Sequence, residues 1–529
     1  MGARTYIELF AGCGGLSLGL ASVGYKRLLA NELSPMAAET YAYNLLATDL
    51  RSSSFAESAT DVRNVLWIES AFPASDVVRR LSENLSGDED KPYSDLNGLD
   101  RESLQGKLLV GDIRRLNAYL EQTGSRVVDS PDVISGGPPC QSFSLAGMRE
   151  YGNQRNRLPW EFARFVDMHQ PKLAILENVS GILHPFREGE RRVHAWFEVA
   201  KAFAQIGYAP ICLHVNAVNV GVAQNRPRFL MFAVRSDLVG EVRGRLGDAA
   251  WVMGMGSELL EARGNVEFDP SKHRVVDLRG KGASDGMATL AGIFSPDGPP
   301  ASVSEAIDDL SSSDAPSAYV RNLDDTLAGS LNSVSPQSGS RPFNHALRTH
   351  TGRVRARFRI YQVLAHENID RRLVRIVTEA LRVPNGGSAR DLALADAGML
   401  WSTAHQAGLG LIDEQGVPIL EPSETRDLVE RLRTRKHSQR SLRAGRPAPA
   451  ALSIPDDACH YRELRTLSVR EMARIQSFPD GFVFRSTPTT GGARRKFQVP
   501  QYTQVGNAVP PKLGRAIGQF ADLMLGETA

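Results

Sequence analysis

A strand, a glycine-rich turn and a helix follow one another at the start of the sequence, and this order constrains the fold more than any other stretch. The run Thr5–Phe10 has the apolar pattern of a buried strand. The turn Ala11-Gly12-Cys13-Gly14-Gly15 follows, and leucines at positions 16, 18 and 20 give the next helix an apolar face. Glycines in such a turn let a ligand approach the backbone closely. We therefore expect the first unit of a nucleotide-binding α/β fold.

The spacing of the glycines limits which nucleotide can bind. Gly12 and Gly14 fit a dinucleotide fingerprint, but Ser17 stands where its third glycine belongs, which disfavours a pyrophosphate. A second strand, residues 27–31, ends at Glu32, roughly twenty residues beyond Gly12, where a carboxylate accepts hydrogen bonds from ribose hydroxyls. A ribose without a pyrophosphate favours S-adenosylmethionine. A turn that only packs the strand on the helix is the alternative.

A cysteine follows another buried strand. Residues 132–135 are apolar and β-branched, and the Gly136-Gly137-Pro138-Pro139 that follows cannot extend a strand. Cys140 is therefore expected on a loop at a strand's carboxyl end, where open α/β sheets bind their ligands. A lone cysteine is often only a small buried hydrophobe, and this alternative stays open from Cys140 by itself.

Two more strands end in acidic residues. The strand 107–110 is followed by Asp112, which can accept a bond from an adenine amino group or can cap a helix. The strand 172–177 ends at Glu177, which places a carboxylate on the same edge as Cys140. Arg226 and Arg228 enter the strand 229–234 on one face; they can serve that site or can bind surface carboxylates.

Composition excludes several classes of protein. The chain has 529 residues, 42% of them hydrophobic, which allows two or more domains of an ordinary globular protein. The formal charge of +2 is too small to argue for nucleic acid by itself. The four cysteines lack the spacing of a zinc site or a disulfide framework, so we expect no metal. No apolar run reaches a membrane span and no signal peptide precedes the first strand, so we expect a cytoplasmic, nucleoid-associated protein without membrane contact.

Motifs along the chain resemble those of the cytosine-5 DNA methyltransferases, in the order that the family has. The matching segments are 8–15, 31–32, 111–113, 137–144, 177–179, 224–228, 465–480 and 504–510. They fall in about the first 235 residues and the last 75. The resemblance implies a Rossmann-like S-adenosylmethionine-dependent domain, a mixed and mostly parallel sheet with helices on both faces, plus a smaller irregular target-recognition domain.

The resemblance also implies a reaction. Cytosine C5 is a poor nucleophile, so the Cys140 thiolate would add to C6 and turn C5 into an enamine that attacks the methyl group of S-adenosyl-L-methionine. Glu177 would hold the N3 and amino edge, Arg228 would hold O2, and Arg226 would support Arg228. The base must be flipped out of double-stranded DNA to be reached.

Further roles combine these patterns with what the resemblance implies. The residues expected at the cofactor are Phe10, Gly12, Gly14, Glu32, Asp112, Ile113, Pro139 and Asn507. Those expected at the DNA are Gln141, Ser144, Arg155, Arg353, Arg355 and Arg357. The alternating arginines 353–359 are predicted on one face of a strand, although a charged run is often only a solvated surface.

We expect residues 1–235, with an insertion at about 49–105, to form the catalytic domain, completed by 500–529. The segment 62–81 of the insertion is predicted to be helical, and 284–317 to be loops. Residues 236–499, including the returning segment 462–485, are expected to form the target-recognition domain. The expected protein is a monomeric modification enzyme with a cognate restriction or defence system as a partner. A transfer RNA cytosine-5 methyltransferase and a catalytically silent DNA-binding accessory subunit are the alternatives.

Overall fold

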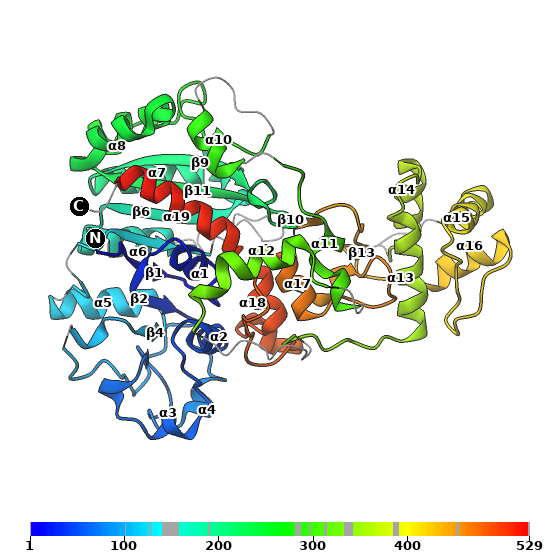
Figure 1. Cartoon of the computed structure of the whole chain (residues 1–529), viewed down its shortest axis with the longest axis horizontal. Coiled ribbons are helices and arrows are strands. Elements are labelled where there is room, and N and C mark those ends of the chain that lie inside the picture. Colours follow the sequence, from blue (N-terminus) through cyan, green and yellow to red (C-terminus); the bar gives the residue numbers. More distant parts are fainter. Residues whose placement is uncertain are drawn as a thin grey trace.

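The computed structural model describes residues 2–100, 102–124, 126–128, 130–139, 158–188, 191–280, 287–295, 298–311, 315–332, 342–383, 391–450 and 454–526. In this part of the chain a nine-stranded sheet has the order β12-β9-β11-β6-β5-β1-β2-β4-β3. Neighbouring strands are parallel except where β11 meets β6 and β9. The expected mixed, mostly parallel sheet is confirmed (Figure 1).

The strands at both edges of this sheet are short, and the longest, β9 and β11, lie inside it. They are β1 (Thr5–Leu9), β2 (Lys26–Glu32), β3 (Val65–Trp67), β4 (Leu108–Val110), β5 (Val133–Gly136), β6 (Leu173–Val179), β9 (Tyr208–Asn216), β11 (Pro227–Arg235) and β12 (Val276–Asp277). Central strands such as β5 and β11 are buried almost throughout. Burial on both faces requires the near-continuous apolar runs by which the sequence predicted these strands.

Helices cover both faces of the sheet. One face packs against α5 (Ile113–Thr123), α6 (Leu158–His169), α7 (Ala195–Gln205) and α9 (Gly254–Glu261). The other packs against α1 (Gly15–Ala21), α8 (Val239–Leu246), α10 (Ala288–Phe294) and α19 (Pro511–Leu525). Along α19, Leu513, Ile517, Phe520 and Met524 form the apolar stripe that faces this core.

Helices α1 and α19 approach each other backbone to backbone. A Cβ added at Gly19 would lie 2.5 Å from the carbonyl carbon of Gly514, so only glycine fits at that position. Arg515 of α19 donates to the carbonyl of Ser22 at 2.7 Å, across 493 positions of sequence. The two helices lie side by side although they are far apart in the chain (Figure 1).

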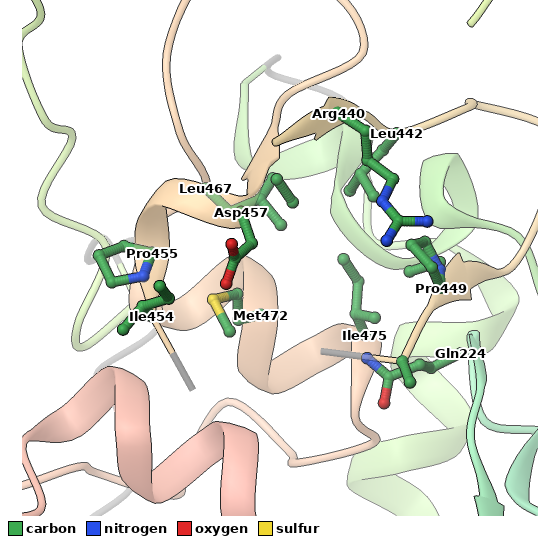
Figure 2. A pocket seen from close by; sticks show the side chains of 13 residues that line it. Gln224, Arg440, Leu442, Pro449, Ile454, Pro455, Asp457, Leu467, Met472 and Ile475 are labelled. Carbon is green, nitrogen blue, oxygen red and sulfur yellow. The ribbon is translucent and has the colours of Figure 1, made fainter. Parts of the chain in front are cut away.

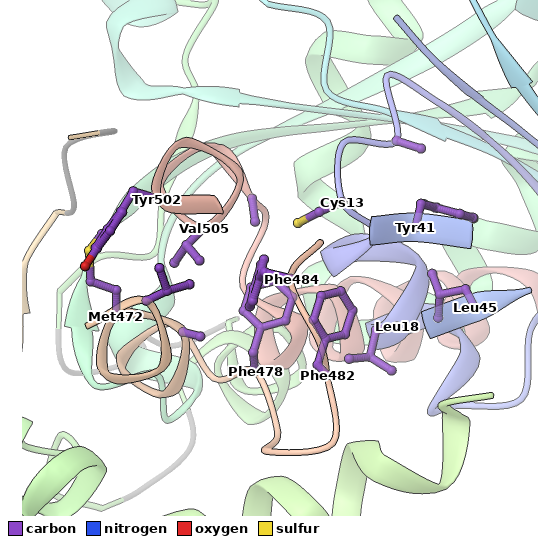
Figure 3. Packing of buried hydrophobic residues seen from close by; sticks show 14 of the residues in the cluster. Cys13, Leu18, Tyr41, Leu45, Met472, Phe478, Phe482, Phe484, Tyr502 and Val505 are labelled. Carbon is purple, nitrogen blue, oxygen red and sulfur yellow. The ribbon is translucent and has the colours of Figure 1, made fainter. Parts of the chain in front are cut away.

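A second layer of helices joins the N-terminal turn to the returning C-terminal segments. It contains α2 (Pro35–Leu45), α11 (Val303–Ile307), α12 (Ala318–Leu327), α17 (Val469–Ile475) and α18 (Gln501–Asn507). Three rings, Phe478, Phe482 and Phe484, have centroids 4.7 to 5.2 Å apart and fill the space between Leu18 and Val505 (Figure 3). Residues 478–505 therefore pack against the helix that follows the glycine turn.

Four helices form a separate apolar core away from the sheet, at the right of Figure 1. They are α13 (Gly352–Leu364), α14 (Arg371–Ala380), α15 (Leu394–Gln406) and α16 (Pro422–Arg431). Three short two-stranded sheets complete the described structure: β7 (Phe186–Glu188) with β8 (Arg191–Val193), β10 (Gln224–Asn225) with β14 (Ala448–Pro449), and β13 (Arg440–Ser441) with β15 (Ala458–Cys459).

The insertion differs from its predicted helical form. Within it, β3 adds an edge strand to the sheet, and only α3 (Ser53–Glu57) and α4 (Val77–Arg80) are α-helical. Arg80 forms a buried ion pair with Asp95 at 2.7 Å and lies over the ring of Trp67. The backbone N–H of Trp67 also donates to Asp95. Pairing with β4 decides the conformation of Val65–Trp67, and a local sequence pattern does not contain that partner.

Two further predictions about the middle of the chain are wrong. The segment 284–317, predicted as loops, contains α10 and α11, and Leu290 and Phe294 of α10 are fully buried. The expected domain boundary at 235 is also misplaced, because β12 extends the sheet and α8 and α10 share the core of α19. Residues 239–294 thus pack with the first domain.

Candidate active site

The carboxyl ends of the parallel strands meet at one edge of the sheet. Phe10 follows β1, Glu32 ends β2, Asp112 follows β4, and Glu177 lies near the end of β6. Strand β11 runs the other way, so its first residues reach the same edge, and Arg228 lies opposite Val179. Five strands therefore bring side chains from distant parts of the sequence together, as the motif order predicted.

Glu177 and Arg228 form an ion pair at this edge. Arg228 Nε lies 2.7 Å from Glu177 Oε1, and the two side chains are 9% and 11% exposed, Arg228 being the less exposed. Burial lowers the pKa of the Arg228 guanidinium, and the Glu177 carboxylate opposes that shift. The pair presents a hydrogen-bond acceptor and a donor side by side in a nearly dry environment.

The strand before the cysteine loop ends against this ion pair. A Cβ added at Gly137 would lie 3.0 Å from Glu177 Oε2, so the glycine allows the loop to begin at the carboxylate. Asn178 Nδ2 donates to the Pro138 carbonyl at 2.9 Å and holds the first proline. This contact was not predicted, although Asn178 belongs to the motif around Glu177.

Four predicted site residues follow Pro139 within 140–157, a stretch outside the described residues. Cys140, Gln141, Ser144 and Arg155 lie outside the described residues, so their expected roles stay predictions. Pro139 itself is exposed.

Arg226 links the site to the C-terminal segment. Its Nη2 donates to the Gly506 carbonyl at 2.7 Å and to the Ala508 carbonyl at 3.0 Å. Burial lowers the pKa of Arg226 well below its ordinary value, and the neighbouring Arg228 cation adds to that effect. The side-chain hydrogen bonds that the structure gives Arg226 are with these backbone carbonyls of the C-terminal segment.

The glycine turn is braced by Glu32. Its Oε2 accepts from the Gly12 N–H at 2.8 Å and its Oε1 from the Ser34 N–H at 2.7 Å. Burial raises the pKa of this carboxyl, although the backbone donors lower it. Phe10 and Gly12 have left-handed φ angles of 55° and 57°, and a Cβ at Gly12 would meet no atom within 4 Å. The turn therefore leaves open space above a rigid backbone.

Gly14 and Ser17 are held by the residues beneath the turn. Gly14 has a φ of 97°, and a Cβ there would lie 2.5 Å from Leu45 Cδ1. Ser17, which replaces the third glycine, donates a short hydrogen bond to Glu8 and also bonds the hydroxyl of Tyr41 at 2.7 Å. Burial raises the pKa of Glu8 to about 8. This buried polar cluster was missed, although the departure at Ser17 pointed to it.

Asp112 is the N-cap of α5, the alternative that the sequence left open beside adenine binding. Its Oδ1 accepts from the Arg114 N–H at 2.8 Å, and its Oδ2 pairs with Arg114 Nη2 at 2.7 Å. Ile113 is buried. Asp112 and Gly111 also line a small pocket whose other wall comes from the insertion, with Glu69 and Lys91. No sequence pattern predicted that the insertion reaches the expected adenine position.

Asn507 ends α18 and is exposed. Gln504, one turn earlier in the same helix, makes hydrogen bonds to α2. Its side chain accepts from Thr40 Oγ1 at 2.6 Å and donates to the Met36 carbonyl at 3.1 Å. Gln504 was not predicted as a site residue. It fixes α18 to α2, directly below the turn.

The prediction that arginines 353–359 alternate along a strand is wrong, because these residues belong to helix α13. Arg353 and Arg357, four residues apart, both point to the end of α16: Arg353 donates to the Arg431 carbonyl, and Arg357 Nη1 to the Leu432 carbonyl at 3.2 Å. Arg357 is 6% exposed, so it supports the helical core. Arg355 is exposed.

Two searches within the described residues concern other kinds of site. None of their helices has the length and apolar character that a membrane span needs. Among the same residues, no group of three or more histidine, cysteine or acidic side chains is arranged to hold a metal ion.

Comparisons with known proteins agree with the motifs. The family model described as C-5 cytosine-specific DNA methylase matches residues 4–66, 105–288 and 332–520. The Type II methyltransferase M.DdeI of Desulfomicrobium norvegicum is 25% identical over 516 residues, 97% of this chain and 87% of its own length. The Type II methyltransferase M1.HphI of Haemophilus parahaemolyticus is 24% identical over 518 residues, 97% of this chain and 86% of its own length. A crystal structure of Spodoptera frugiperda DNMT2 covers 98% of this chain with a TM-score of 0.39 and 12% identity.

Proposed function

We propose a covalent mechanism for this chain, which belongs to the C-5 cytosine-specific DNA methylase family and methylates cytosine in DNA with S-adenosyl-L-methionine as its methyl donor. In this mechanism Cys140 forms an adduct with C6 of a flipped cytosine in a specific sequence. The observation that carries the proposal is the ion pair of Glu177 with Arg228, which lies against the start of the Cys140 loop.

The pair fits one edge of cytosine. The carboxylate of Glu177 accepts from the exocyclic amino group and from a proton on N3, and the guanidinium of Arg228 donates to O2. Because the two groups are 2.7 Å apart and almost fully buried, they can face neighbouring atoms of one ring. Placing positive charge at O2 and a proton at N3 makes C6 more electrophilic, so the Cys140 thiolate can add to it.

Two steps would follow the addition of Cys140: methyl transfer to C5 and elimination of the cysteine. Addition at C6 would move an electron pair to C5, which would bond to the methyl carbon as the bond from that carbon to the donor's sulfonium sulfur breaks and leaves a neutral thioether. A base, in the simplest case water, would then take the C5 proton, so that the C5–C6 double bond re-forms and Cys140 leaves as a thiolate. The bound donor supplies an electrophilic methyl group on a sulfonium. The residues near β1 and β2 fit its nucleoside: Gly12 leaves open space above the turn, and Glu32 puts a carboxylate beside that space.

The proposed roles of the other residues follow from their places. Phe10, Gly14, Asp112, Ile113, Pro139 and Asn507 are proposed to bound the donor, and Gln141, Ser144, Arg155, Arg353 and Arg355 to contact DNA. Arg357 is left out of the DNA set, since it is buried against α16. We further propose a monomer that works in the cytoplasm on nucleoid DNA, beside a cognate nuclease or defence system, in keeping with the Type II relatives.

The test is conversion sequencing of DNA from cells that express the chain, beside cells that express Cys140→Ala. We expect 5-methylcytosine at one recurring sequence in the first sample and none in the second. Methylated transfer RNA together with unmethylated DNA in the first sample would refute the proposal.

A further inference from the structure

Two segments continue the strands that carry the Glu177–Arg228 ion pair. Strand β11 is preceded by β10, which pairs with β14 in parallel, and Figure 2 shows Gln224 of β10 and Pro449 of β14 at this junction. The middle region thus joins the site there. Strand β6 is followed by the hairpin of β7 with β8, residues 186–193, which lies outside the motif segments.

The connections place the hairpin at the same edge of the sheet as the ion pair. Strand β6 runs towards this edge and ends at Val179, and the next residue, Ser180, forms a hydrogen bond with His214 of β9 at 2.8 Å. Strands β6 and β9 run in the same direction, since both are antiparallel to β11. Helix α7 leads from the hairpin to the start of β9 at the opposite edge, so it begins near the edge that carries the ion pair. The hairpin therefore lies between the end of β6 and the beginning of α7.

One face of the hairpin is buried and the other is exposed. Phe186 lies opposite Val193, and these two residues are 8% and 7% exposed and pack on the core that also holds α7. Successive side chains of a strand point to opposite faces, so the next pair, Arg187 and Arg192, points the other way. Both arginines are exposed. The hairpin thus holds two guanidinium groups towards solvent, above an apolar anchor.

The two arginines form a like-charged pair. Arg187 lies directly opposite Arg192 in the antiparallel register. The Cβ atoms of such a pair are about 4.5–5.5 Å apart, and like charges in this position destabilise a hairpin. Neither guanidinium forms an ion pair with a side chain that the structure describes. Burial lowers the pKa of the nearby His194, and the Arg192 cation lowers it further. The pair is therefore a local concentration of positive charge that an anion would neutralise.

A phosphodiester suits two guanidinium groups that face solvent side by side. Each guanidinium presents a planar fork of N–H donors, and a phosphodiester has two charged oxygens, one for each fork. Contacts with phosphates also fix the position of a protein on a duplex. The formal charge of the whole chain is only +2, so local groups such as this pair must supply the attraction for DNA.

We propose that Arg187 and Arg192 together bind one phosphate of the DNA substrate, close to the target cytosine. The proposal rests on the proposed function, which places the target cytosine at the ion pair. It makes the hairpin a DNA contact of the catalytic domain, in addition to the contacts expected from the Cys140 loop and from α13. The duplex would be held at the edge of the sheet by the hairpin after β6 and by the middle region that joins at β10.

The first test measures how tightly the full chain binds a fluorescent duplex of random sequence at several salt concentrations. The logarithm of the association constant falls with the logarithm of the salt concentration, by about 0.9 for each phosphate that the protein neutralises. We expect Arg187→Gln/Arg192→Gln to bind about tenfold more weakly and to reduce this slope by about one, because the two arginines share one phosphate. A reduction by about two would indicate two separate phosphates and would overturn the shared site.

The matched control removes the same charge from the opposite edge of the sheet. Arg126 follows α5 and Arg263 follows α9, and both are exposed. A Cβ added at Gly264 would lie 2.6 Å from the Lys201 carbonyl in the second half of α7, which places Arg263 away from the ion pair. Arg126→Gln/Arg263→Gln should therefore keep the affinity and the slope of the wild type. Equal losses in the two double variants would show an effect of net charge alone and would overturn the proposal.

The second test locates the phosphate on a duplex with the recognition sequence found by conversion sequencing. Phosphates near the target cytosine are replaced one at a time by neutral methylphosphonates. One position should weaken binding of the wild type about tenfold and leave the arginine double variant unchanged. In methyl transfer, the KM of that variant for DNA should rise about tenfold, more than kcat falls. If no position distinguishes the two proteins, the proposal is wrong.

A measurement of stability excludes a structural role. Because Arg187 and Arg192 repel each other, Arg187→Gln should keep or raise the free energy of unfolding in the absence of DNA. A lower value would show that the arginine supports the fold, and would contradict the proposal. If conversion sequencing finds no methylated DNA, the proposed function fails, but the salt titration still decides whether the pair binds a phosphate, since that titration needs no methylation.

Discussion

Removing the charge of Glu177 should lower both the free energy of unfolding and the rate of methyl transfer, and each effect can be measured by itself. In Glu177→Gln the Arg228 guanidinium stays buried without its counter-ion, and breaking a buried pair in this way costs about 3–5 kcal/mol. The attraction itself is on the order of 4 kcal/mol for unit charges about 4 Å apart at an effective dielectric constant of 20. The exposures of 9% and 11% place the pair in this regime.

A double-mutant cycle measures the coupling. The wild type, Glu177→Gln, Arg228→Gln and the double variant are unfolded in urea, and the first transition that reports the sheet domain is compared. We expect the double variant to be less destabilised than the sum of the single variants by about 2 kcal/mol or more, because neither charge then remains unpaired.

The control cycle uses an ion pair on the surface. Asp277 and Arg279 lie 2.6 Å apart but are 49% and 46% exposed, so their coupling should not exceed about 1 kcal/mol. Equal couplings in the two cycles would refute the view that burial governs the Glu177–Arg228 pair. Methyl transfer should fall by about a hundredfold or more in all three site variants. An active double variant would contradict the role given to the pair.

Three further predictions concern residues around the site. Glu8→Gln should flatten the pH dependence of the free energy of unfolding. The folded-state pKa of Glu8, about 8, lies above the ordinary 4.5, so the stability that the protonated carboxyl contributes below pH 4.5 is lost by about 1.4 kcal/mol per pH unit as the pH rises to 8. Denaturation at pH 5.5 and 7.5 should therefore show a larger loss of stability in the wild type than in Glu8→Gln. Gly137→Ala should reduce methyl transfer at least tenfold with unchanged donor binding, because its Cβ would lie 3.0 Å from Glu177 Oε2; full activity would contradict this. Deleting residues 504–529 should abolish donor binding in calorimetry, since Gln504 and the carbonyls that hold Arg226 are lost; unchanged affinity would count against it.

Sequence patterns predicted the sheet and the edge at which the motif residues meet, because both depend on local apolar runs and on where the strands end. Strands such as Leu173–Val179 and Pro227–Arg235 were found within two residues, since burial on both faces leaves a continuous apolar signal. Glu177 and Arg228 were expected at one site, but their ion pair was not predicted, because it depends on the antiparallel register of β11.

What was not predicted depends on tertiary partners. The arginines at 353, 355 and 357 alternate as they would in a strand, but Ala356, Phe358 and Ile360 are buried in a helical core, and that packing decides the conformation. The two backbone N–H groups that Glu32 accepts from, and the carbonyls that Arg226 binds, carry no side-chain signature in a sequence.

The backbone contact of α1 with α19 has a consequence for synthesis on the ribosome. The helix that covers this face of α1 lies far away in the sequence, because Arg515 of α19 bonds Ser22 across 493 positions. Until α19 has been synthesised, Leu16 and Leu20 have no cover from that helix, and the growing polypeptide exposes them to chaperones and to its neighbours.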